Sequence, residues 1–132
     1  MIEMAAPANP SKTSILIIED DPALSKMYQE KFTHEGFDAF VANDGQAGLN
    51  MALTKKPSCI LLDMMLPKYS GMDVLSQLRQ DKNGADTTVI CLSNKTEREH
   101  MERALKFGVK EYLAKAMYTP EEVVERVKKY LK

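Results

Sequence analysis

Cysteine, tryptophan and long apolar runs are scarce in this sequence. The chain has two cysteines and no tryptophan in 132 residues. Cys59 and Cys91 both lie within apolar runs, so we expect two buried thiols in a reducing compartment rather than a disulfide. Apolar stretches such as 15–18 and 59–62 are far too short to span a membrane, and the N-terminus lacks a signal-type apolar segment. We therefore expect a cytoplasmic protein that has no membrane segment.

An excess of charge of one sign is also missing. The 18 basic and 19 acidic residues are interleaved and give a formal net charge of -1. Such a surface offers no broad basic patch, so direct nucleic-acid binding is not expected. The apolar and charged fractions, 44% and 28%, are those of an ordinary globular domain, and 132 residues are enough for one such domain.

Short β-type runs alternate with helical patterns along most of the chain. Residues 1–13 lack apolar periodicity and predict a flexible leader, which leaves one domain over 14–132. The predicted strands are 14–18, 38–42, 58–62, 88–92 and 111–113, and the predicted helices are 22–35, 45–54, 72–80, 96–106 and 120–131. Because the strands are continuously apolar, they indicate a parallel sheet that is covered on both faces. The sequence therefore predicts an α/β fold with a doubly wound five-stranded parallel sheet and five helices.

Several helix ends carry clear local signals. Asp21 before Pro22 and Thr119 before Pro120 each place a capping residue ahead of a proline at the first helical position. Gly36 follows the first predicted helix, in a position that favours a left-handed residue. Gly108 stands in the same way after the fourth.

Polar residues that could bind a ligand or take part in a reaction follow the predicted strands. Ligands of open parallel sheets bind at the carboxyl ends of the strands, so residues from several strands should meet there. These residues are Glu19, Asp20, Asp21, Asp63, Ser93 and Lys115. Neighbouring carboxylates repel one another unless a cation lies between them, and Mg²⁺ prefers such oxygen ligands.

Each of these residues also has an ordinary structural interpretation. Asp21 is best explained as a helix cap, and Asp63 alone could be a turn residue. Ser93 alone could be a loop hydroxyl and Lys115 alone a solvated lysine, while Glu19 and Asp20 could end a strand in solvent. The combination is more informative than any single member.

Four segments together resemble the motif set of response-regulator receiver domains from two-component signalling, chemotaxis regulators included. They are residues 15–21 (ILIIEDD), 62–67 (LDMMLP) with Gly71, 92–93 (LS) and 112–115 (YLAK). The segments occur in the family order, and the resemblance extends from about Ser14 to Lys132. It implies the flavodoxin-like receiver fold.

The resemblance also implies roles for individual residues. Asp63 would be the phosphoacceptor, with Mg²⁺ held by Glu19, Asp20, Asp63 and the Met65 backbone carbonyl. Ser93 and Lys115 would bind phosphoryl oxygens. Movement of Ser93 would let Tyr112 turn inward and alter the surface formed by 96–106 and 111–132. Self-catalysed phosphorylation and dephosphorylation would make the chain a signalling switch rather than a metabolic enzyme.

The implied partners follow from a two-component phosphorelay. A histidine kinase or a histidine phosphotransfer protein would donate the phosphoryl group, and a downstream target protein would read the altered surface. A phosphorylation-dependent homodimer is a further alternative, and a stand-alone regulator and an excised domain both remain open.

The sequence departs from the family at two positions. Ala116 follows Lys115 where the family usually has a proline, often in a cis linkage. Because a cis bond before alanine costs roughly 2.5 to 4 kcal/mol, we expect a trans bond. Asn94 stands where the family typically has a smaller residue, and it could either raise or lower the rates of phosphotransfer or hydrolysis. His34 and His100 are expected on exposed helix faces, without metal-ligand partners.

Three other functions share part of this pattern. A flavodoxin-like redox domain needs a phosphate-binding loop after the first strand, where acidic residues would repel the phosphate. Aspartate-nucleophile phosphatases resemble a pattern with the nucleophile after strand one, whereas Asp63 follows strand three. A receiver-like interaction module that is not phosphorylated is the most serious rival, and the complete set of acidic, hydroxyl and lysine residues argues against it.

Overall fold

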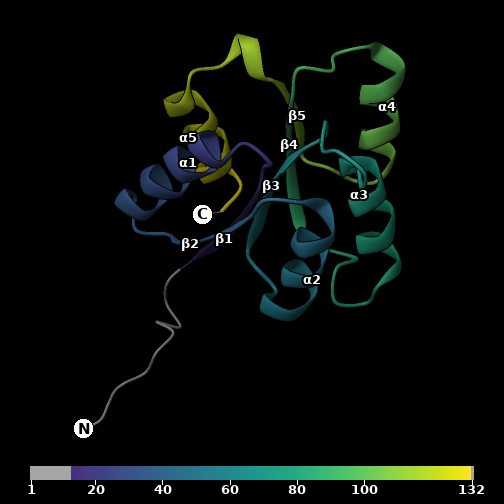
Figure 1. Ribbon diagram of the computed structural model, residues 1–132, viewed down its shortest axis with the longest axis horizontal. Helices are drawn as coiled ribbons and strands as arrows, with labels where there is room; N and C mark the ends of the chain where they lie inside the picture. The colour runs from purple at the N-terminus through teal and green to yellow at the C-terminus, as the bar shows by residue number, and fades with distance from the viewer. Residues whose placement is uncertain (1–12, 132) are drawn as a thin grey trace, which may run out of the picture.

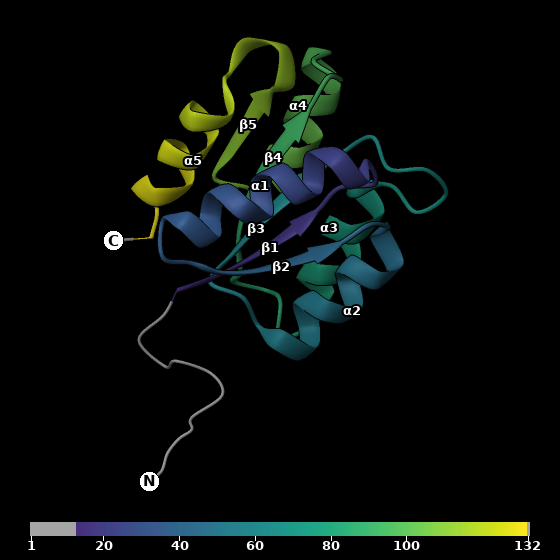
Figure 2. The same ribbon diagram turned by 60° about the vertical axis from the view of Figure 1, so that its left-hand side comes forward.

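Five parallel strands form a single sheet in the computed structural model, which describes residues 13–131. The strands are β1 Ser14–Ile18, β2 Asp38–Ala42, β3 Cys59–Asp63, β4 Thr88–Ser93 and β5 Glu111–Ala114, in the spatial order β2-β1-β3-β4-β5. Helices α1 Pro22–His34 and α5 Pro120–Lys129 cover one face. Helices α2 Gly45–Lys55, α3 Gly71–Gln80 and α4 Arg98–Lys106 cover the other (Figures 1 and 2).

The predicted fold class and all ten predicted elements are confirmed. Strands β3 and β4 each run one residue further than predicted, to Asp63 and Ser93, and α4 begins two residues later, at Arg98. A short 3-10 helix over Lys115–Met117 was not predicted. The predicted leader, apart from Thr13, lies outside the described residues.

Each central strand contributes side chains to both layers of the core, as the continuous apolar runs predicted. In β1, Leu16 and Ile18 pack toward α2, α3 and α4, whereas Ile15 and Ile17 pack toward α1 and α5. Cys59 and Cys91 are fully buried on opposite faces of the sheet, and burial raises the pKa of both thiols to about 12. The expected buried free thiols are therefore confirmed.

The helix ends follow the predicted local chemistry. The Asp21 side chain accepts hydrogen bonds from the backbone N–H groups of Ala23 and Leu24, at 3.0 and 3.3 Å. Thr119 forms a reciprocal capping box with Glu122 at the start of α5. Gly36 and Gly108 have φ angles of 94° and 76°, the left-handed region that glycine enters without steric strain.

Arg79, near the end of α3, holds two loops together. Its guanidinium donates to the backbone carbonyls of Gly84 and Thr87 at 2.9 and 2.8 Å, and to that of Phe107 at 2.6 Å. The first two carbonyls belong to the α3–β4 connection, and the third follows α4. One side chain therefore satisfies backbone acceptors of two separate connections.

We expect Arg79→Lys to lower the free energy of unfolding by about 2 kcal/mol, because a lysine cannot reproduce the planar fork and leaves carbonyl groups unpaired. Urea denaturation monitored by far-ultraviolet circular dichroism measures the change. Arg98→Lys is the matched control, since Arg98 lies 91% exposed in an ion pair with Glu102 and should alter stability little. Equal losses in the two variants would contradict this role for Arg79.

Candidate functional site

Parallel pairing brings the ends of four strands to one edge of the sheet. In register, Ile18 lies opposite Leu62, Asp63 opposite Leu92, and Ser93 opposite Ala114. The residues that end or follow these strands are therefore neighbours: Glu19, Asp20, Asp63, Ser93 and Lys115. All five were predicted from the sequence to meet here.

Three carboxylates gather at this edge. Glu19, Asp20 and Asp63 each offer an oxygen atom, and these atoms all lie within 4.8 Å of one another. Glu19 and Asp63 are each only 4% exposed, whereas Asp20 is exposed to solvent. The cluster thus has a buried side and an open side.

Lys115 supplies the positive charge on the buried side. Its Nζ lies 3.0 Å from Oε1 of Glu19 and 3.2 Å from Oδ2 of Asp63. Burial and the nearby Asp63 charge raise the pKa of Glu19 to about 7. Burial alone would lower the pKa of Lys115, but its hydrogen bond to Glu19 and the charge of Asp63 raise it instead. The lysine therefore stays charged between the two acids.

Backbone N–H groups fix the other oxygen of each buried acid. The N–H of Met65 donates to Oδ1 of Asp63 at 2.9 Å, and that of Asp21 donates to Oε2 of Glu19 at 3.1 Å. Both carboxylates are thus held at each end, by a backbone donor and by Lys115. Their orientation does not depend on solvent.

Asn43 supports the site, although it was not among the residues predicted from the sequence. Its Nδ2 donates to the backbone carbonyl of Glu19 at 2.8 Å and to Oγ of Ser25 at 3.1 Å. Because Asn43 directly follows β2, the strand-end rule that found Asp63 would also have found it. Tyr28 lines a small cavity beside Glu19, and burial together with the Glu19 charge raises its pKa to about 12.

Ser93 and Tyr112 are joined through the loop that follows β4. Ser93 is completely buried, and its Oγ accepts a hydrogen bond from the Lys95 N–H at 3.0 Å. The Tyr112 hydroxyl donates to the Lys95 carbonyl at 2.5 Å. The Tyr112 ring is half-buried in this structure, and its inward turn on movement of Ser93 stays a prediction.

The two histidines differ in their surroundings. His34 is exposed, as predicted. The prediction of an exposed face is wrong for His100, because its ring is half-buried and stands edge-on to Tyr112, with centroids 6.1 Å apart and planes at 82°. The helical pattern of α4 could not reveal this contact, since it comes from a different element.

The two departures from the family pattern have simple local outcomes. No peptide bond within residues 13–131 is cis, so the expected trans bond between Lys115 and Ala116 is confirmed. The chain enters the 3-10 helix at Lys115 while keeping the lysine ammonium on the acids. Asn94 is exposed beside Ser93.

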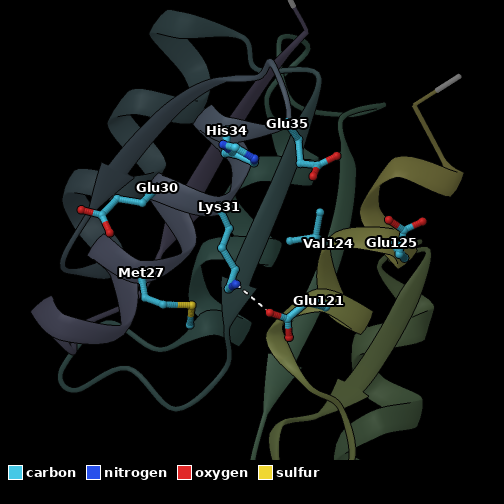
Figure 3. Close-up of a pocket in the computed structure, with 8 residues that line it drawn as sticks. All are labelled: Met27, Glu30, Lys31, His34, Glu35, Glu121, Val124 and Glu125. Atoms are coloured by element: carbon cyan, nitrogen blue, oxygen red, sulfur yellow. Dashed lines mark hydrogen bonds and ion pairs between the residues drawn. The ribbon is translucent and has the colours of Figure 1, made fainter.

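A separate hollow lies between α1 and α5, with a volume of about 460 Å³ (Figure 3). Met27, Val124 and Glu125 are among its lining residues, and the ion pair between Lys31 and Glu121, 2.8 Å long, crosses it. The hollow shares no residue with the carboxylate cluster. Across the part of the chain that the structure describes, no helix is long and apolar enough to cross a bilayer.

Comparison with known proteins agrees with this geometry. Residues 15–128 match the response regulator receiver domain family. The chain belongs to this family. The receiver domain is 33% identical over 120 residues to the response regulator ArlR of Staphylococcus epidermidis, an alignment that covers 91% of this chain and 53% of ArlR.

Solved receiver structures share the fold. The Francisella response regulator 1452 receiver domain superposes with a TM-score of 0.81 at 30% identity, covering 90% of this chain and 96% of that one. A DrrB receiver domain described as BeF3-activated superposes with a TM-score of 0.78 at 27% identity, covering 91% and 97%. The receiver domain spans about half the length of the curated relatives it matches.

Removal of the Lys115 charge, which contacts both Glu19 and Asp63, tests the electrostatics of the site. We expect Lys115→Met to lower the free energy of unfolding by about 2 kcal/mol, because Glu19 and Asp63 would face each other without a counter-charge. Adding Asp63→Asn should recover much of that loss, since one of the two charges is then gone. Urea denaturation of the single and double variants measures the cycle.

Lys31→Met is the control for this cycle, because Lys31 forms a more exposed ion pair with Glu121. It should cost well under half as much stability, and Asp63→Asn should not compensate for it. Additive effects of Lys115→Met and Asp63→Asn would show that the lysine does not stabilise these acids.

Proposed function

We propose that this receiver domain accepts a phosphoryl group on Asp63 with the help of Mg²⁺ and thereby switches a protein-interaction surface. The observation that carries the proposal is the position of Lys115, whose ammonium bonds both Asp63 and Glu19 within a cluster of three carboxylates. An acid held beside a fixed cation and further metal ligands has the surroundings that phosphoryl transfer needs.

The donor set suits Mg²⁺. Glu19, Asp20 and Asp63 provide hard oxygen ligands close together, and the exposed side at Asp20 leaves room for coordinated water. We assign the Met65 backbone carbonyl as a further ligand on the basis of the family pattern. When bound, the metal would neutralise charge on the phosphoryl oxygens.

Asp63 would act as the nucleophile. One of its carboxylate oxygens would form a P–O bond as the P–N bond of a phosphohistidine donor breaks, and the histidine would keep the bonding electrons. The backbone N–H of Met65 and the ammonium of Lys115 already orient the carboxylate. Once the acid is esterified, Lys115 would bind a phosphoryl oxygen and the Ser93 hydroxyl would donate to another.

The phosphodonor would be a histidine kinase or a histidine phosphotransfer protein. A downstream target protein would bind the switched surface. Ser93, Lys95 and Tyr112 connect the phosphoryl site to the β4–α4 loop and to β5 through consecutive hydrogen bonds. The proposed output surface therefore comprises α4, β5 and α5. A receiver-like module that is not phosphorylated is the alternative, and it requires none of this chemistry.

We expect treatment with a small phosphodonor and Mg²⁺ to add one acid-labile phosphoryl group, because Asp63 ends β3 next to the strand that carries the Ser93 hydroxyl and also lies beside Lys115 and the metal ligands. Intact-mass spectrometry measures the addition. Asp63→Asn should abolish it, whereas Asp86→Asn, an exposed loop acid, should leave it unchanged. Undiminished labelling of Asp63→Asn would refute the assignment of the acceptor.

The metal ligands should differ in their contributions. We expect Asp20→Asn to weaken Mg²⁺ binding by about tenfold or more, and Glu19→Gln to weaken it less, because Glu19 is already bonded to Lys115 and the Asp21 N–H. Isothermal titration calorimetry measures both affinities.

Without metal, Asp20→Asn should fold more stably than the parent, since it relieves repulsion among the carboxylates, and excess Mg²⁺ should narrow that gap. Urea denaturation with and without Mg²⁺ tests this expectation. A variant less stable than the parent under both conditions would contradict it.

A further inference from the structure

His100 on α4 has one ring nitrogen with no visible function. Its Nε2 is out of reach of solvent and has no hydrogen-bond partner among residues 13–131. The same ring stands edge-on against Tyr112 of β5. A buried polar atom without a partner is costly, so a native chain that retains one calls for a functional explanation.

The surroundings of His100 disfavour a charged ring. It borders a hollow of about 290 Å³ that is otherwise lined by Lys95, Glu97, Glu99 and Arg103. Burial, followed by the charges of Lys95 and Arg103, lowers the pKa of His100, against a smaller opposite effect of Glu97. The neutral ring places only a lone pair or an uncharged N–H at the buried position, whereas the protonated ring would bury a charged donor without an acceptor.

The ring also ends a continuous set of contacts from the phosphoryl site. Ser93 accepts from the Lys95 N–H, the Lys95 carbonyl accepts from Tyr112, and Tyr112 packs against His100. Any outward rotation of Tyr112 would break its bond to Lys95 and vacate the edge of the His100 ring. The position of His100 is therefore linked to the backbone that carries Ser93.

We propose that His100 is a positioning residue that holds Tyr112 inward, with its hydroxyl on the Lys95 carbonyl, and thereby biases the output surface before any phosphoryl group is present. Only the signalling role of this contact rests on the proposed function. The contact between the two rings is independent of Asp63 chemistry. It also accounts for the half-buried position of the Tyr112 ring in this structure.

A pH dependence follows from this role. The packed ring binds a proton less readily than a free histidine, whose ordinary pKa is 6.5. The inward state of Tyr112 is therefore fully favoured above that pH, and it is lost as the pH falls through the lowered pKa of His100. Besides Tyr112 on β5, the charged groups facing the ring are those of Lys95, Glu97, Glu99 and Arg103.

Nuclear magnetic resonance of the unphosphorylated protein, labelled on tyrosine and histidine rings, tests the proposal between about pH 8 and pH 5. In the parent protein the Tyr112 ring signals should shift with the titration of His100, which should occur below the ordinary histidine pKa of 6.5. His100→Phe should keep the inward signals at neutral pH but lose their pH dependence, because it preserves the ring edge without a titrating group. His100→Ala should shift the signals toward the outward state at every pH.

His34→Ala is the matched control, since His34 is exposed on α1, and it should leave the Tyr112 signals and their pH dependence unchanged. The proposal is overturned if Tyr112 signals in His100→Ala match those of the parent, or if they still shift with pH in His100→Phe. Unchanged ring signals from Tyr28, which is buried on α1 far from His100 in the sequence, would show that the variants remain folded.

Affinity for beryllofluoride, a phosphoryl mimic, separates this inference from the proposed function. We expect His100→Ala to bind the mimic about fivefold more weakly in the presence of Mg²⁺, and His34→Ala to bind it like the parent. Failure of every protein to bind the mimic would count against phosphoacceptance while leaving the ring result intact. Equal affinities of His100→Ala and the parent would show that Tyr112 and the phosphoryl site are not linked.

Discussion

Glu19 and Asp63 bring two negative charges into an edge of the sheet that water hardly reaches, and the ammonium of Lys115 lies between them. The alignment of β1, β3 and β5 sets this arrangement, because each acid and the lysine stand at or just past the end of a strand. Without the lysine, the buried acids would repel each other and oppose folding. The same balance holds the two acids in fixed orientations at this edge.

The strand order explains why the acids meet. The chain passes from β1 to β2 on one side and then crosses over to β3 on the other side of β1, so the connections diverge at the ends of β1 and β3 (Figure 2). Such a switch point leaves a crevice outside the carboxyl ends of the strands. Glu19 and Asp20 reach it from one strand and Asp63 from its neighbour.

Much of this arrangement could be predicted from the sequence, because a parallel sheet turns position along the chain into position in space. Continuous apolar runs located the strands, and the polar residues after them located Glu19, Asp63, Ser93 and Lys115. Contacts that depend on side-chain reach could not be predicted in this way. Arg79 satisfies carbonyls after α4, and His100 packs against β5, and neither contact has a counterpart in local periodicity.

The two buried thiols can report local opening of the fold, because each lies under a different layer of helices. Cys59 lies in the layer beneath α1 and α5, and Cys91 in the layer beneath α2, α3 and α4. Because burial holds both pKa values near 12, neither thiol reacts with an alkylating reagent while the layer above it is closed. Alkylation rates at the two positions would therefore report separately how often each helical layer lifts from the sheet. Each face of the sheet thus carries a native thiol whose alkylation rate measures the opening of that face, with no label added to the chain.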